Sequence, residues 1–368
     1  MAAINKQEFT ELINTLVAIH NKGKYADIPN VVMDKSVQQL LKKYAEHYNL
    51  ILTDTVDQLY NAVNSTDLLT VKKQSEIISK LEYRLNLLNK TVQENVEQDI
   101  IKAYITGQVT TAMNFIDKVD TTEVLQAVQF SIVNSNMASN LVADAMEDLL
   151  FVTQHTSKEV KKVVRTTFAE ALQYQTINKE KSTATMQLLE KRLSKWGIKN
   201  KMYEDGFIGI VDKSGRKWKL KTYVEMAVNT KNHNAYVQGV KDKTLEYNTD
   251  LAKIPYRGSS DPCKHFEGII ISMNGLTKGF PTYDQLKSTG MVFHPRCRHS
   301  PMAIGDLDFI QDQDIEHHNK QVKKLNEKME EYKAEQKAKA GLQAAAPVKK
   351  KRGRPKKKLN YEQISFFD

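Results

Sequence analysis

The 368-residue sequence predicts a mainly α-helical protein, with an N-terminal helical bundle over 1–200 and a small α+β domain over 201–306. A charged helix over 307–340 and a disordered basic tail over 341–368 are predicted to follow. Three observations support this order. Apolar residues recur at helical spacing in the first half. Short β-rich runs and turn signals begin near Tyr203, and lysine and arginine crowd the tail.

The N-terminal bundle is predicted from periodicity and from the scarcity of proline. Pro29 is the only proline before residue 200, and it is expected to break an early loop, with Asp34 or Ser36 capping the next helix. Weaker helical repeats run over 124–133 and 141–150. The clearest repeat, at 3.6-residue spacing, comprises Val37, Leu40, Leu41, Tyr44, Tyr48, Ile51 and Leu52.

The α+β domain is predicted from stretches in which the spacing of apolar residues alternates between strand-like and helix-like. Residues 207–220 place a turn signal, Asp212-Lys-Ser-Gly, between two β-rich runs, which predicts a β-hairpin. Helical spacing returns over 223–240, and residues 245–256 read as strand and loop. Residues 268–272 predict a short strand that ends in the Asn274-Gly275 turn. This domain also holds both cysteines of the chain.

The two cysteines lie beside histidines, in Asp261-Pro-Cys-Lys-His and His294-Pro-Arg-Cys-Arg-His. Zinc prefers four nitrogen or sulfur ligands in a tetrahedron. One structural zinc ion is therefore predicted, with one surplus or outer residue among the five candidates Cys263, His265, His294, Cys297 and His299.

Three alternatives remain open for this cluster. The residues can hydrogen-bond two loops together without an ion. A Cys263–Cys297 disulfide is disfavoured by the reducing cytosol in which the chain is expected to be made. A catalytic cysteine beside a histidine would need an oxyanion hole and a third group, which the sequence does not supply. The protein is therefore expected not to be an enzyme.

Three segments carry a resemblance to a known family: 212–230, with its turn, its tryptophan and its Tyr-x-x-Met helix, then 260–268 and 293–300 with the Cys/His block. In this order they resemble the phage minor capsid (minor head) proteins related to the Mu F-like head morphogenesis proteins. The resemblance covers about 200–305. It implies a low-copy virion protein inside the head and near the portal, made in the host cytoplasm and acting in head assembly and in DNA packaging or ejection. Portal and capsid proteins are its implied partners.

The basic tail carries most of the net positive charge. The net charge is +10, but outside 341–368 there are 46 basic and 42 acidic residues, or +4. Arg352-Gly-Arg-Pro resembles an AT-hook, in which glycine lets the backbone enter a narrow minor groove and the arginines lie along A·T pairs. A merely soluble basic tail is one alternative, and a nuclear-import signal, for which a phage protein in bacteria has no use, is another. The predicted DNA-binding residues are Lys349, Lys350, Lys351, Arg352, Gly353, Arg354, Pro355, Lys356, Lys357 and Lys358.

The last residues resemble the short peptide by which bacterial proteins bind the sliding clamp. Two rings would fill an apolar pocket while a glutamine bonds its rim; a terminal strand or docking onto the chain's own helices are the alternatives. A DNA-associated factor, recruited to A·T-rich DNA or to the host clamp, is therefore a second functional hypothesis. The clamp-like residues are Gln363, Ile364, Phe366 and Phe367.

Membrane insertion is not expected. No stretch of the sequence approaches 18 consecutive apolar residues. The first residues lack the basic-then-apolar pattern of a signal peptide, so the protein is expected to stay where it is made.

Overall fold

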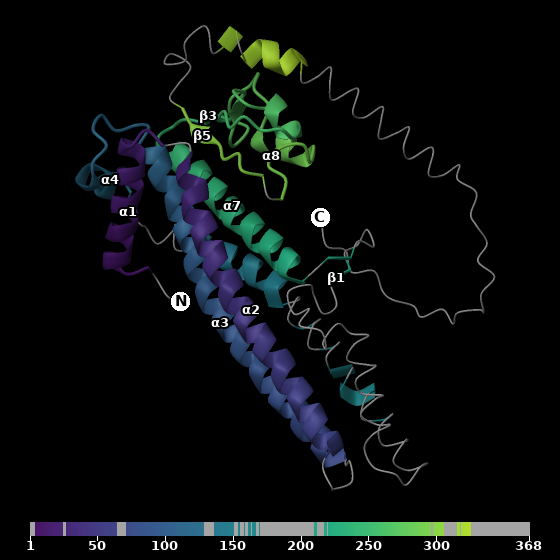
Figure 1. Cartoon of the computed structure of the whole chain (residues 1–368). Coiled ribbons are helices and arrows are strands. Elements are labelled where there is room, and N and C mark those ends of the chain that lie inside the picture. The colour runs from purple at the N-terminus through teal and green to yellow at the C-terminus, as the bar shows by residue number, and fades with distance from the viewer. Residues whose placement is uncertain are drawn as a thin grey trace, which may run out of the picture. The chain divides into compact units, whose positions relative to one another are not determined.

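The structure is a computed structural model of the chain. It describes residues 4–24, 27–64, 71–128, 136–150, 210–211, 217–218, 220–295 and 297–304, with a few residues between 154 and 169 and most of 315–324. Those up to residue 321 belong to one compact unit. It is mainly helical with a small sheet, which confirms the predicted fold class (Figure 1). The basic tail and the clamp-like peptide lie outside the described residues.

The bundle is built on two long helices, α2 (Ile28–Asn64) and α3 (Val71–Ala112), with α1 (Lys6–Asn21) and α4 (Thr121–Ala127) at one end (Figure 1). Lys43 donates to Asn95 at 2.7 Å, and Arg84 pairs with Asp54 at 2.9 Å. Residues later in α2 therefore meet residues earlier in α3, and the two helices are antiparallel.

The start of α2 differs from the prediction. The helix begins at Ile28, so Asp34 and Ser36 lie inside it and the predicted caps were wrong. The reason is the position of Pro29, which falls in the first turn. There its missing N–H has no partner to lose and its fixed φ already suits a helix.

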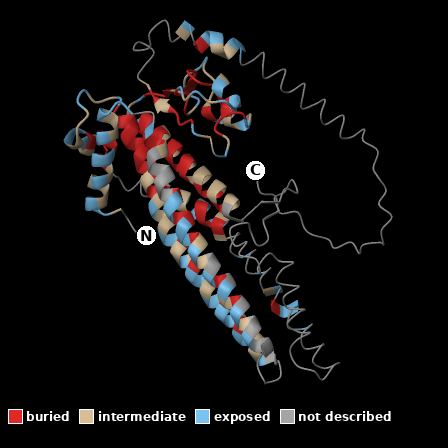
Figure 2. Cartoon of the chain, viewed as in Figure 1, coloured by how far each residue is buried: buried red, intermediate tan, exposed pale blue. Residues whose placement is uncertain are grey.

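The core of the bundle follows the predicted periodicity. Figure 2 shows burial becoming continuous at the end of α3 where α7 (Leu220–Glu246) packs, and residues 103–113 are all buried. Of the predicted stripe on α2, five side chains are described and buried: Val37, Leu40, Leu41, Tyr44 and Ile51.

Helices α3 and α7 cross in backbone contact through two glycines. A Cβ atom added at Gly107 would lie 2.1 Å from the carbonyl oxygen of Tyr236, and one added at Gly239 would lie 2.1 Å from that of Tyr104. Only glycine permits this approach. Beside the crossing, the hydroxyls of Thr110 and Tyr236 lie 3.1 Å apart.

Two small sheets complete the fold. Strand β1 (Ile210–Val211) pairs antiparallel with β2 (Lys217–Trp218), which confirms the predicted hairpin. The second sheet has the order β4-β3-β5, with β3 (Leu251–Lys253) paired antiparallel to β4 (Ile270–Ser272) and to β5 (Met302–Ala303). Strand β4 and helix α7 were predicted, whereas β5 was not.

The sheet is fixed to the bundle by polar contacts. Asn114, just past the end of α3, donates to the carbonyl of Ala303 in β5 at 2.6 Å. Tyr236 of α7 donates to the carbonyl of Pro301 at 3.4 Å. The helical and the α+β parts therefore pack within one unit. The predicted boundary near residue 200 lies outside the described residues and stays a prediction.

One buried carboxylate organises the turn after β4. Asp250 accepts hydrogen bonds from the backbone amides of Asn274, Leu276 and Thr277 at 2.7, 2.9 and 3.0 Å, and also from the Ser272 hydroxyl. Burial would raise the pKa of Asp250, but these four donors hold that pKa below its ordinary value.

Part of the predicted charged helix is described. Residues 315–316 and 318–324 are helical, and Nδ1 of His318 accepts from the amide of Ile270 in β4 at 3.1 Å. The rest of the 307–340 prediction lies outside the described residues. Among the described helices, none combines the length and the apolar character that a membrane-spanning segment needs.

Candidate metal centre

The first cysteine is presented by a short 3-10 helix, η3 (Pro262–His265). Proline starts this helix without the loss of a needed donor. The carboxylate of Asp261 caps it by accepting from the amide of Cys263 at 3.0 Å. As a result the Cys263 side chain is buried against the loop that carries the second cluster.

The second cluster follows the short helix α8 (Tyr283–Ser288). Phe293 has a φ of 55°, a left-handed conformation that is costly for a bulky residue and that recurs at functional sites. Its ring is buried and packs against Tyr283, with 4.5 Å between ring centroids. Directly after it, the amide of Cys297 donates to the carbonyl of His294 at 2.8 Å, so the two side chains come from one turn.

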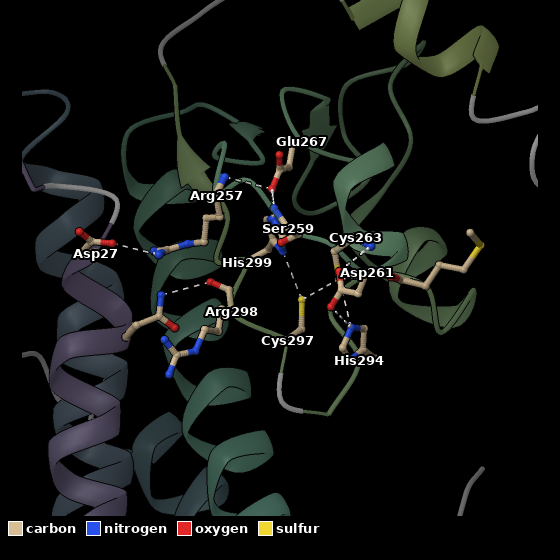
Figure 3. A network of polar contacts seen from close by, with 12 residues as sticks. Asp27, Arg257, Ser259, Asp261, Cys263, Glu267, His294, Cys297, Arg298 and His299 are labelled. Carbon is tan, nitrogen blue, oxygen red and sulfur yellow. Dashed lines mark hydrogen bonds and ion pairs between the residues drawn. The ribbon is translucent and has the colours of Figure 1, made fainter.

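Three predicted ligands converge in the structure. Ligand atoms of Cys263, His294 and Cys297 all lie within 4.8 Å of one another (Figure 3). The two sulfur atoms are 3.6 Å apart, and Cys263 Sγ is 3.1 Å from His294 Nε2. His299 joins this group on one side, with Nδ1 3.6 Å from Cys297 Sγ.

These separations suit a metal better than a disulfide. Both cysteines are free, and their sulfur separation is well above the roughly 2.05 Å of a disulfide bond. Zinc bonds of about 2.3 Å to sulfur and about 2.0 Å to nitrogen give tetrahedral edges of roughly 3.8 Å between sulfurs and 3.5 Å from sulfur to nitrogen. The two 3.6 Å distances lie close to those edges, and the group is compatible with a structural metal.

The fifth predicted ligand, His265, lies in η3 and is not part of the converging group. Asp261, which caps η3, places Oδ2 3.9 Å from His294 Nε2. The structure therefore brings three of the predicted residues together, places His299 in contact with one of them, Cys297, and leaves His265 outside the converging group.

A buried carboxylate that was not predicted stands behind His299. Glu267 Oε1 lies 2.9 Å from His299 Nε2 and accepts from the backbone amides of Arg257 and Ser259 at 3.0 and 3.2 Å (Figure 3). Histidines that bind metals commonly donate their other ring nitrogen to a carboxylate. An acidic residue close to the Cys/His block was the one available signal for Glu267.

The pKa values of the two thiols in the cluster shift in opposite directions. Burial and the neighbouring Cys297 raise the pKa of Cys263. Burial also opposes ionisation of Cys297, but its hydrogen bond with His299 lowers its pKa below the ordinary range. Cys297 is therefore the first thiolate to form, and a cation bound between the sulfurs would deprotonate both.

A pocket of about 430 Å³ opens beside the cluster, between α2, α7 and the 293–298 loop, and His294 and Cys297 form part of its wall. His233 of α7 also lines it and was not predicted. Burial, with smaller effects from Lys287, His299 and His294, lowers the pKa of His233 to about 3, so its ring is neutral near neutral pH. Its Nε2 has no hydrogen-bond partner among the described residues.

The cluster is tied to the start of the bundle. Arg257, whose amide bonds Glu267, pairs through its guanidinium with Asp27 at 3.0 Å (Figure 3). Asn30, in the first turn of α2, donates to the carbonyl of Arg298 at 3.1 Å. The loops that carry the ligands therefore contact the beginning of α2 at two points.

Comparison with known proteins identifies a family whose model matches the chain. The family described as Phage minor capsid protein 2 matches residues 33–341, which include most of α2, the whole of α3 and α7, and both parts of the Cys/His cluster. Neither a curated protein nor a solved structure matches the chain. The match leaves out the basic tail but covers well over half of the sequence, and the chain therefore belongs to the Phage minor capsid protein 2 family.

Proposed function

We propose that this phage minor capsid protein is a low-copy virion component placed inside the head near the portal, where it contacts portal and capsid proteins. In this role it acts in head assembly and in DNA packaging or ejection. The observation that carries the proposal is the family match over residues 33–341. The antiparallel helices α2 and α3, of 37 and 42 residues, carry exposed positions along their length that are available for such contacts.

The Cys/His cluster holds one structural zinc ion in this proposal. The convergence of Cys263, His294 and Cys297 supports it, with the fourth ligand drawn from the remaining histidines. The strands of the small sheet have only two or three residues each, so loops make up much of this part, and a metal that fixes those loops contributes directly to folding. A site filled by four protein ligands keeps no open position for a substrate, which favours a structural role over catalysis.

The tail supplies DNA contacts in this proposal. Arg352 and Arg354 enter the minor groove of A·T-rich DNA, and the lysines on either side meet phosphates. The support is the sequence Lys349-Lys-Lys-Arg-Gly-Arg-Pro-Lys-Lys-Lys, together with the concentration of positive charge there.

Mass spectrometry of purified virions tests the placement. The protein is expected in particles at far lower copy than the major capsid protein. Its absence from particles, with recovery on intracellular DNA, would favour the second function, a DNA-associated factor. The observation behind that alternative is the tail with its clamp-like end, Gln363-Ile-Ser-Phe-Phe.

Elemental analysis tests the metal. Purified protein is expected to carry about one zinc ion per chain, because four ligands of this kind form a single tetrahedral site. Replacing Cys297 with alanine should release the ion and lower the melting temperature. A metal-free protein whose melting curve is unaffected by a chelator would contradict the zinc proposal. It would favour the alternative in which these residues hydrogen-bond the loops together without an ion.

A further inference from the structure

The protonation of the His299 ring follows from what surrounds Glu267. Its Oε1 atom already accepts from two backbone amides, those of Arg257 and Ser259, which can only donate. The contact of 2.9 Å from the same oxygen to His299 Nε2 must then be a hydrogen bond that the ring donates. Nε2 therefore carries a proton, and in a neutral ring the lone pair lies on Nδ1, which faces Cys297 Sγ.

The other histidine of the cluster is fixed in the same way. Nδ1 of His294 lies 2.9 Å from the carbonyl oxygen of Pro295, an atom that can only accept. Nδ1 therefore holds the proton and Nε2 carries the lone pair, which faces Cys263 Sγ at 3.1 Å. When both rings are neutral, each therefore turns a lone pair toward a cysteine sulfur, although they use different nitrogens.

We infer that His299 is the fourth metal ligand, bound through Nδ1, and that Glu267 is the positioning residue that holds it in this role. The inference rests on the zinc centre proposed above. The 3.6 Å from His299 Nδ1 to Cys297 Sγ is close to the sulfur–nitrogen edge of a zinc tetrahedron, about 3.5 Å. His299 stands outside the group of three whose ligand atoms all lie within 4.8 Å of one another, so its ring must move toward Cys263 and His294 to complete the site.

Glu267 is suited to this task by its own anchoring. It is buried, and the two amides that it accepts come from the 257–259 loop, so its carboxylate is held without help from the metal. A carboxylate behind a metal-bound histidine orients the ring and makes the ligating nitrogen more basic. His265, the competing candidate, lies in η3 and, like His299, is outside the converging group, but His299 Nδ1 has a contact with Cys297 Sγ at 3.6 Å.

Zinc titration of the full-length chain against a competing chelator tests the inference. Glu267→Gln keeps the size of the side chain but removes its charge, and should weaken zinc binding by about 10–100-fold. His299→Ala should weaken it by roughly 100-fold or more, and free imidazole should restore part of the loss. His265→Ala and Glu246→Gln, a glutamate on α7 that pairs with Lys243, should bind zinc as the unaltered chain does.

A double variant separates positioning from general stability. In His299→Cys a thiolate replaces the imidazole and donates no hydrogen bond to Glu267. Adding Glu267→Gln to that variant should therefore cause no further loss of zinc affinity, whereas a merely structural effect of Glu267 would appear in both backgrounds. Visible spectra of the cobalt-loaded chains report whether four protein ligands remain.

The outcomes distinguish this inference from the zinc proposal. If His265→Ala loses a ligand and His299→Ala does not, the inference is overturned and the zinc centre stands. Wild-type affinity in Glu267→Gln overturns the positioning role alone. A chain that binds no zinc overturns both.

Discussion

Replacing Gly107 with alanine is expected to force α3 and α7 apart. The added Cβ would lie 2.1 Å from the carbonyl oxygen of Tyr236 and 3.0 Å from the backbone nitrogen of Val240. An ordinary contact begins at 3.4 Å, so the two backbones must separate by 3.4 less 2.1, or about 1.3 Å. Since both partners are backbone, no side-chain rotation relieves the clash.

The loss in free energy of unfolding depends on the contacts that this separation of α3 and α7 disturbs. Overpacking of this kind costs about 1–3 kcal/mol. Two hydrogen bonds join the helices here, Thr110 to Tyr236 at 3.1 Å and Tyr104 to Asp242 at 2.5 Å. Each contributes about 1 kcal/mol or somewhat more when a carboxylate accepts. Alanine returns about 1 kcal/mol through its higher helix propensity. The net destabilisation is therefore about 2–4 kcal/mol.

Thermal unfolding followed by circular dichroism measures this change. At about 2 °C per kcal/mol for a unit of this size, the melting temperature should fall by roughly 4–8 °C. Gly239→Ala should cost a similar amount, and the double variant less than the sum, because one separation relieves both clashes. The exposed Gln98→Ala on α3 is the control and should change little. A Gly107→Ala protein that melts within about 1 °C of the unaltered chain would refute the backbone contact.

Three further predictions address the sheet, the link to α2 and the tail. Since the folded pKa of Asp250 is lowered, its contribution to stability is present above the unfolded pKa of about 3.9 and is lost as the pH falls through the folded value. Asp250→Asn should therefore lower the free energy of unfolding by about 2–3 kcal/mol at pH 7. Urea unfolding should show that the gap between the variant and the unaltered chain narrows below about pH 4. Arg257→Ala should barely change the melting temperature, because the ion pair with the half-exposed Asp27 is worth less than about 1 kcal/mol, but hydrogen exchange should rise at the start of α2; unchanged exchange would contradict this link. A peptide of residues 341–368 should prefer A·T-rich over G·C-rich duplex in fluorescence anisotropy and lose that preference when Arg352 and Arg354 become alanine; equal binding to both duplexes would reduce the tail to a polycation.

Local patterns predicted the elements of the fold but not their junctions. The predicted hairpin over 207–220, the helix over 223–240 and the strand over 268–272 each carry their signal within a short stretch, and the structure has β1 and β2, α7 (Leu220–Glu246) and β4 (Ile270–Ser272) there. Strand β5 has only two residues, too few to show an alternation. The contact of Gly107 with Gly239 joins positions far apart in sequence, and no local period reveals it.

The residues of the candidate site also fall into two groups, those that the sequence predicted and those that only the folded structure reveals. The close spacing of cysteines and histidines in the sequence identified Cys263, His294 and Cys297, which the structure brings together. His294 and Cys297 come from one turn of the chain. Glu267 and His233 depend on tertiary packing. Glu267 contacts the ring of His299, which lies 32 positions further along the chain, and His233 lines the pocket from α7.

The span of the Cys/His cluster has a thermodynamic consequence. Cys263 and Cys297 are 34 positions apart, and both β4 and α8 lie in the chain between them. An ion held by both ends binds the folded segment but not the unfolded chain, in which the ligands are far apart, so it stabilises the fold by mass action. Above the dissociation constant, each tenfold rise in free zinc would stabilise the folded segment by about 1.4 kcal/mol. The stability of this part of the head protein would then be set by the metal supply of the infected cell as well as by its sequence.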